Sequence, residues 1–179
     1  MKLYKILFLL LLISINTKAQ SSIYSFQIDS VANGSVIDFN AFSGKKILIV
    51  NAASGDSAFN QYEELKQLQQ LYAESLIIVI VPSNSFGNEQ LSEAEMATSY
   101  QQNSGIYFPV SIKLAVTGSN IHPLYSWLTQ KSLNAVMDIE VKADFQKFLI
   151  DREGKLVGVF SKRVKPLSND MQEAIQTNN

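Results

Sequence analysis

The stretch "KKILIVNAASGDSAFNQYEEL" (residues 45–65) decides the fold of this chain, because it joins two different periodicities. Its first part, residues 45–53, is an apolar run without polar alternation, which predicts a strand buried on both faces. The segment at residues 60–74 has apolar side chains at helical spacing, and Asn60 is its predicted N-cap. Asp56 lies in the polar turn between them. A buried strand that leads through a turn into a helix is typical of α/β proteins, many of which keep a reactive group at that turn.

The pattern continues on both sides of this stretch. Residues 91–105 predict a helix with Ser92 as its N-cap, Glu95 at the capping-box position and Gly105 as its stop. The other predicted elements are a short strand at residues 35–42, a buried strand at 76–82, a helix beginning at "HPLYSWLTQK", a hairpin at 145–161 around "DREG" and a closing helix at 168–176. Parallel strands joined by helices, then a hairpin, then a helix describe a thioredoxin-like α/β sandwich with a central mixed sheet flanked by helices.

Composition excludes several classes of function. The chain has 179 residues, a net charge of −1 and 17% charged residues, so it lacks the basic surface that nucleic acid or an anionic membrane requires. There is no cysteine and only one histidine, which excludes cysteine catalysis, Cys-ligated metals and multi-His metal sites. We expect no cofactor and no metal. The length is that of a single domain, expected at residues 20–179.

The N-terminus has the pattern of a secretory signal peptide. Two lysines precede the uninterrupted apolar run "ILFLLLLISI" (residues 6–15), and the small residues Thr17 and Ala19 then form a cleavage site. The run is half of the roughly 20 residues that a membrane-spanning helix needs, so a transmembrane anchor is the weaker interpretation. We therefore predict that residues 1–19 are removed, and that the mature protein begins near Gln20 and is periplasmic or secreted.

Six blocks of sequence, in the right order and with the right gaps, resemble the glutathione peroxidases over roughly residues 23–175. They are "KKILIVNAAS", "NQYEEL", "VPSNSFGNEQ", "GIYFPV", "NIHPLYSWL" and "FQKFLIDREGKLVGVF". They are similar to the family's "GK-LLIVNVAS", "-PQYKEL", "FPCNQFGGQEP", "GVTFPL", "NAHPLYKFL" and "FTKFLVDREGKVV-RF". The resemblance implies a thioredoxin-like fold. It also implies a role in oxidative stress, the reduction of hydroperoxides with glutathione or thioredoxin as the thiol partner.

The resemblance also implies where the catalytic groups should be. The family's nucleophilic cysteine or selenocysteine falls at Asp56, its Gln at Ser85, its Trp at Ala143 and its Asn at Asp144, and a resolving cysteine falls near Tyr100. Sulfur can accept an oxygen atom and be reduced back by a thiol, whereas a carboxylate cannot. No thiol is present to react with glutathione or thioredoxin. We therefore predict that peroxidase activity is lost and that the protein is a binding or scaffold module.

Two other uses of these residues remain open. Asp56 and Asp144 should approach each other if the fold holds, and they would then share a proton or bind a cation with help from Ser83 or Ser85. The protein would in that case be an altered enzyme that uses this carboxylate or cation site. The two basic residues Lys162 and Arg163 lie beside the predicted site, where they could contact the carboxylates of a ligand.

A serine hydrolase is the remote alternative. The motif "GDS" after an apolar strand resembles the start of the GDS-type esterases and would make Ser57 the nucleophile. Those enzymes have an aspartate three residues before a late histidine, whereas here Ser119 precedes His122, the only histidine.

Overall fold

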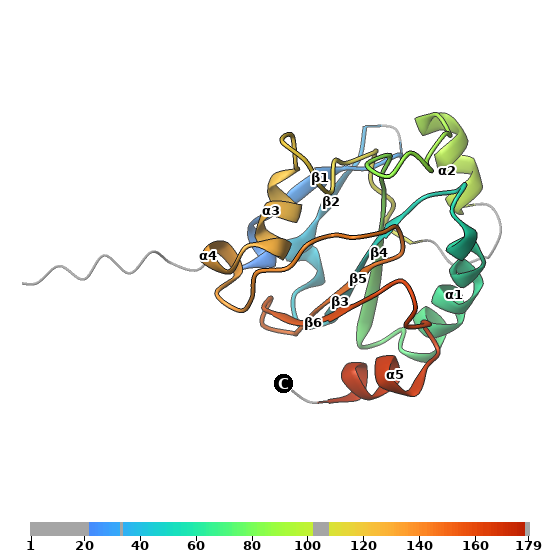
Figure 1. Cartoon of the computed structure of the whole chain (residues 1–179). Coiled ribbons are helices and arrows are strands. Elements are labelled where there is room, and N and C mark those ends of the chain that lie inside the picture. The colour runs from blue at the N-terminus through green and yellow to red at the C-terminus, as the bar shows by residue number, and fades with distance from the viewer. Residues whose placement is uncertain (1–21, 33, 102–107, 178–179) are drawn as a thin grey trace, which may run out of the picture.

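A four-stranded mixed sheet forms the centre of the protein, in the order β4-β3-β5-β6 (Figure 1). The computed structural model describes residues 22–32, 34–101 and 108–177. The strands are β3 (Lys46–Ala52), β4 (Leu76–Pro82), β5 (Lys147–Ile150) and β6 (Leu156–Phe160). β3 and β4 are parallel, and β5 is antiparallel to both β3 and β6. All seven residues of β3 are buried, as its unbroken apolar sequence predicted.

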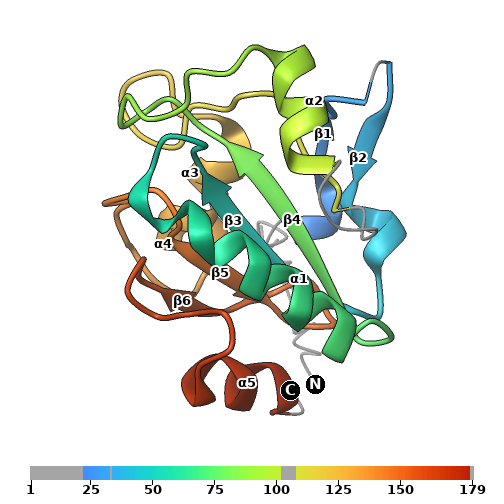
Figure 2. The ribbon, with the colours of Figure 1, turned by 90° about the vertical axis from the view of Figure 1, so that its right-hand side faces the viewer.

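Helices cover both faces of the sheet. They are α1 (Gln61–Leu71), α2 (Glu93–Gln101), α3 (Pro123–Thr129), α4 (Lys131–Asn134) and α5 (Asn169–Gln176). Buried side chains of α1, α2 and α5 share one apolar cluster, and in Figure 2 α1 crosses in front of β3 and β4. Buried side chains of α3 belong to the cluster on the opposite face. No helix in the described part of the chain is both long and apolar enough to span a membrane.

The helix ends show one correct and one wrong prediction. The capping box is confirmed, since the Ser92 backbone N–H donates to Glu95 Oε2 at 2.7 Å. Asn60 makes no side-chain capping bond, because a 3-10 turn (Ser57–Asn60) already precedes α1. That turn is capped by Asp56, whose Oδ1 accepts the Ala58 N–H at 2.7 Å. The predicted stop at Gly105 lies outside the described residues.

The N-terminal part differs most from the prediction. The strand expected at residues 35–42 is only β2 (Val36–Asp38), because Asp38 caps a 3-10 turn at Phe39–Phe42 by accepting the Asn40 N–H. β2 pairs with β1 (Gln27–Asp29), which the sequence did not predict. Three residues are too few to show a strand periodicity.

Candidate functional site

The turn after β3 holds Asp56 in an ion pair. Lys162, from the loop after β6, brings its Nζ to 2.6 Å from Asp56 Oδ1 and 2.7 Å from Oδ2. The Asp56 side chain is 7% exposed, against 31% for Lys162. Because Oδ1 also accepts the Ala58 N–H, the carboxylate is fixed by two partners. Asp56 is thus a neutralised, largely buried group that also caps the turn leading into α1.

Asp144 lies close to this ion pair but bonds elsewhere. Its Oδ2 accepts a hydrogen bond from Asn88 Nδ2 at 2.8 Å, and the residue is 1% exposed. Burial raises the pKa of Asp144; the Asn88 bond and the Lys162 ammonium lower it, and the charge of Asp56 adds to the rise. The Gly55 N–H donates to the Asn88 carbonyl at 3.0 Å, so Asn88 links the Asp56 turn to Asp144.

The two carboxylates therefore interact electrostatically, while the ammonium group of Lys162 takes the place of a cation on Asp56. Two carboxylates supply few ligands for a metal ion. Within residues 22–32, 34–101 and 108–177, no three His, Cys, Asp or Glu side chains gather in a way that could hold one.

Ser85 and Ala143, the positions that the resemblance assigns to the family's Gln and Trp, have structural contacts here. Ser85 Oγ accepts the Val116 N–H at 3.0 Å and the Ser83 hydroxyl at 3.0 Å. Ala143 has no polar side-chain atom, and its carbonyl accepts Asn51 Nδ2 at 2.9 Å. These bonds hold loops together, and neither side chain supplies a donor comparable to an amide or an indole N–H.

Tyr100, near the position predicted for a resolving cysteine, lies on α2 and contacts a residue of the loop beside the site. Its hydroxyl donates to Glu89 Oε2 at 2.6 Å, and both residues are 0% exposed. Burial and the bond to Glu89 raise the pKa of Tyr100. Glu89 also accepts the backbone N–H and the hydroxyl of Ser54, at 3.0 and 2.7 Å. Sequence reasoning missed Glu89, because a single acidic residue in a loop carries no periodic signal.

A second residue that the sequence analysis missed is Lys147, at the start of β5. It is 0% exposed, and its Nζ donates to Gln61 Oε1, the Phe145 carbonyl and the Val164 carbonyl, each at 2.9 Å. Burial lowers the pKa of Lys147 to about 8, and the charge of Glu64 opposes that shift. All three ammonium protons thus have partners, which a buried cation requires.

The contacts of Lys147 extend to the ion pair. Gln61, which accepts from Lys147, donates its Nε2 to the Lys162 carbonyl at 2.9 Å. The bond from Lys147 to the Val164 carbonyl fixes the same loop two residues further on. Lys147 therefore positions the loop that carries Lys162 onto Asp56. Its place in "FQKFLI" gave one signal, a lysine within an apolar run of the predicted hairpin.

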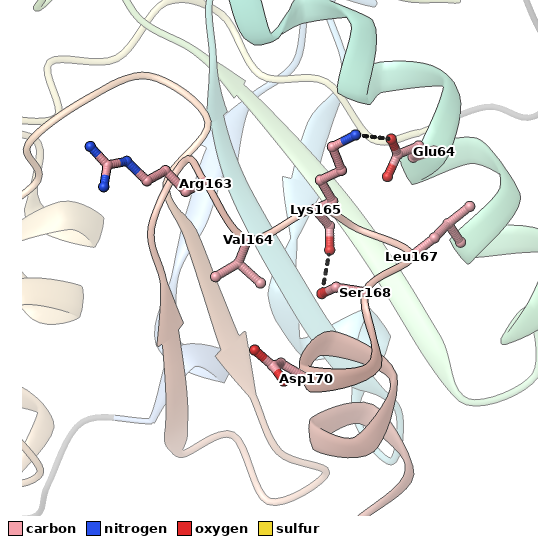
Figure 3. A pocket seen from close by; sticks show the side chains of 7 residues that line it. All are labelled: Glu64, Arg163, Val164, Lys165, Leu167, Ser168 and Asp170. Atoms are coloured by element: carbon pink, nitrogen blue, oxygen red, sulfur yellow. Dashed lines mark hydrogen bonds and ion pairs between the residues drawn. The ribbon is translucent and has the colours of Figure 1, made fainter.

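Lys162 and Arg163, which the sequence analysis named as possible ligand contacts, have different surroundings in the structure. Lys162 is engaged by Asp56, whereas Arg163 lines a groove of about 620 Å³ between the loop after β6 and the start of α5. The lining residues are Glu64, Arg163, Val164, Lys165, Leu167, Ser168 and Asp170. Figure 3 shows the Arg163 side chain extending away from the other lining side chains, while Lys165 reaches toward Glu64 at 3.9 Å. The groove therefore carries charges of both signs around apolar side chains.

The geometry gives no support to a serine hydrolase. Ser57 is exposed in the turn before α1, whereas His122 caps α3, which packs on the opposite face of the sheet. The Nδ1 of His122 accepts the Leu124 N–H at 3.2 Å, so the imidazole is used in capping.

Comparison with known proteins agrees with this architecture. The family model described as glutathione peroxidase matches residues 7–129. The glutathione peroxidase-like peroxiredoxin gpx1 of Schizosaccharomyces pombe is 36% identical over 148 residues, which cover 80% of this chain and 92% of that protein. The glutathione peroxidase homolog BsaA of Bacillus subtilis is 34% identical over 162 residues, 87% of this chain and 99% of that protein.

Solved structures extend the comparison to the fold. The crystal structure of T. cruzi GPX1 has a TM-score of 0.62 and 28% identity, covering 86% of this chain and 92% of that chain. A thioredoxin-family thiol:disulfide interchange protein from Chlorobium tepidum has a TM-score of 0.56 at 19% identity, covering 84% and 92% of the two chains. The fold is therefore that of a thioredoxin-like α/β protein. Within that class, the chain belongs to the glutathione peroxidase family.

Proposed function

We propose that this protein is a non-catalytic member of the glutathione peroxidase family and acts as a binding or scaffold module. The family role is the reduction of hydroperoxides with thiols. The chain contains no cysteine, so it has no sulfur nucleophile to oxidise and no thiol through which glutathione or thioredoxin could reduce it. Peroxide turnover of the family type is then chemically unavailable.

The observation that carries this proposal is the state of Asp56. The resemblance puts the peroxide-attacking group at this position, and the carboxylate found there bonds to Lys162 and to the Ala58 N–H. A carboxylate oxygen cannot accept the peroxide oxygen and release it to a thiol. Only 7% of the Asp56 side chain is exposed in this ion pair, which leaves little of it accessible to a substrate.

A coupled peroxidase assay tests the proposal. Hydrogen peroxide and an organic hydroperoxide are each offered with glutathione and with thioredoxin, to the wild-type protein and to Asp56→Cys and Asp56→Ser variants. The wild type and the Asp56→Ser control are expected to match buffer. Turnover by the wild type well above buffer would overturn the proposal.

The Asp56→Cys variant tests whether the residues around position 56 can still support peroxide reduction. Its thiol would lie next to the Lys162 ammonium, which favours the reactive thiolate. Turnover by this variant alone would trace the loss of activity to residue 56. Without turnover in this variant, a thiol at residue 56 is not sufficient to restore activity.

The proposed location is outside the cytoplasm. The support is the sequence pattern at residues 1–19, which has the charged, apolar and small-residue regions of a signal peptide. Expression of the full chain followed by cell fractionation and N-terminal sequencing is expected to give an exported product that begins near Gln20. A cytoplasmic product that retains Met1 would contradict export.

A further inference from the structure

Three buried oxygen atoms have no hydrogen-bond partner among the described residues. They are Asn51 Oδ1, the Tyr125 hydroxyl and Asp144 Oδ1. Asn51 and Tyr125 are 0% exposed, and Asp144 is 1% exposed. Buried polar atoms in folded proteins almost always have partners, either within the protein or in an ordered ligand. Three such atoms therefore need an explanation.

Backbone and side-chain bonds place Asp144 beside Asn51. Asn51 Nδ2 donates to the Ala143 carbonyl at 2.9 Å, and the Phe145 N–H donates to the Asn51 carbonyl at 2.6 Å. Residue 144 is thus held between two bonds to Asn51. Phe145 has a φ of 60°, in the left-handed region, and the chain turns sharply here before it enters β5.

The Tyr125 side chain packs on the face of the sheet to which Asn51 points. Ile47 and Ile49 pack into the cluster that contains Tyr125, and side chains alternate along a strand, so Asn51 faces the same side of the sheet. The Tyr125 ring lies edge-on to Phe148 at a centroid distance of 6.0 Å, and Phe148 pairs with Ile49, two residues before Asn51 on the same face of the sheet. The unpartnered atoms come from β3, α3 and the segment before β5.

The bonding capacity of the three atoms selects the ligand. Asn51 Oδ1 can only accept, an ionised Asp144 Oδ1 can only accept, and the Tyr125 hydroxyl can donate. A water molecule has two donors and can accept, and buried waters typically make about three hydrogen bonds. We propose that these atoms bind one internal water molecule, which donates to Asn51 and Asp144 and accepts from Tyr125. No member of this set is then left unsatisfied.

This site goes beyond the proposed function, because it concerns how the interior beside Asp56 is kept in place. The water supplies a donor to Asp144, whose other oxygen has only the Asn88 amide. Lys162 is therefore left to pair with Asp56. The water also ties α3, which lies on one face of the sheet, to the turn that carries Asp144.

The Tyr125→Phe variant gives a test in which the sign of the effect decides. The variant keeps the ring and its edge contact with Phe148, at a centroid distance of 6.0 Å, and removes only the hydroxyl. If the hydroxyl bonds to a water, the variant loses a hydrogen bond, and the melting temperature is expected to fall by about 2–4 °C. If the hydroxyl is truly unpartnered, its removal relieves a buried polar group. A melting temperature that stays the same or rises overturns the proposal.

Tyr62→Phe is the matched control. Tyr62 is also buried, and its hydroxyl donates to the Tyr100 carbonyl, so its removal gives the size of the effect when a satisfied phenol bond is lost.

A high-resolution crystal structure of the wild type provides the direct observation. A density peak at about 2.7–3.2 Å from all three oxygen atoms supports the site. An interior without such a peak, or direct bonds among the three side chains, overturns it. Neither outcome depends on whether the protein reduces peroxides.

Discussion

The middle of the central sheet and the region around the C-terminal end of β3, called here the polar edge, are both buried. They differ in how they are stabilised. In the middle, Ile49 is paired with Val79 on one side and Phe148 on the other, and all three are 0% exposed. At the end of β3, the buried residues include four that are polar or charged: Asn51, Glu89, Asp144 and Lys147. The middle is stabilised by removal of apolar surface from water, whereas the edge depends on complete pairing of polar groups. The edge is therefore where a single substitution changes charge and bonding together.

The largest effect is expected from the apolar side of β5. Phe148→Ala removes a fully buried ring that packs edge-on against Tyr125, and we expect the free energy of unfolding to fall by about 4 kcal/mol. Urea unfolding followed by circular dichroism measures the loss. Phe148→Leu keeps much of the volume and serves as the control. Equal losses in both variants would show that the ring volume is not what the site requires.

The neighbouring residue of β5 tests the polar edge. Lys147→Met keeps the length of the side chain but leaves the acceptors of Gln61, Phe145 and Val164 without their donor. We expect a loss of about 3 kcal/mol, since such a change breaks a buried charged network. Hydrogen exchange at residues 161–165 should become faster.

Lys46→Met is the matched control for this variant. Lys46 is 3% exposed and donates to the Ala174 carbonyl at 3.0 Å, near the end of α5 and at the opposite end of β3. Its loss should leave exchange at residues 161–165 unchanged. If both variants accelerate exchange there, Lys147 has no special role in positioning that loop.

The pH dependence of stability is a smaller test of the same lysine. Lys147 has a pKa of about 8 in the folded protein, below its ordinary value of 10.5. Between those two values the unfolded chain binds more protons than the folded one, so stability rises with pH. We expect the difference in unfolding free energy between wild type and Lys147→Met to grow by about 2 kcal/mol from pH 8 to pH 10.5. A flat difference would show that the folded lysine keeps its proton throughout.

The smallest effect is expected at Asp144, with the opposite sign. Its pKa is raised in the folded protein, mainly by burial, so the stability it contributes below its unfolded pKa is lost as the pH rises through the folded pKa. Asp144→Asn removes that titration, and we expect about 1 kcal/mol greater stability at pH 7 than for the wild type. The gain should vanish near pH 3, where the carboxyl is protonated. Thermal unfolding at both pH values measures it.

The two regions also differ in how well the sequence predicted them. The strands of the middle follow from unbroken apolar runs, and β4 has the predicted bounds, Leu76–Pro82. The polar edge depends on contacts between residues far apart in the chain. The pair of Asp56 with Lys162 joins segments separated by 106 residues, and no local pattern could assign those partners.

Sequence reasoning named candidate positions for the site but not the bonds that these residues make. The resemblance drew attention to Asp56, Ser85, Asp144 and Tyr100, and it expected Asp56 and Asp144 to lie near each other. It did not indicate that Lys162 would neutralise Asp56 or that Glu89 would receive the Tyr100 hydroxyl. These are compensations for burying a charge, and they depend on which donors the fold happens to bring within reach.

The long separation between Asp56 and Lys162 also has a kinetic meaning. A contact across 106 residues closes a large loop, and it can form only after β3, β5 and β6 have come together. The pair should therefore be absent from the folding transition state, where its φ-value would be near zero. Its energy then acts on the rate at which the native protein unfolds and leaves the folding rate almost unchanged. Through this one pair, the turn after β3 is expected to lengthen the lifetime of the folded state.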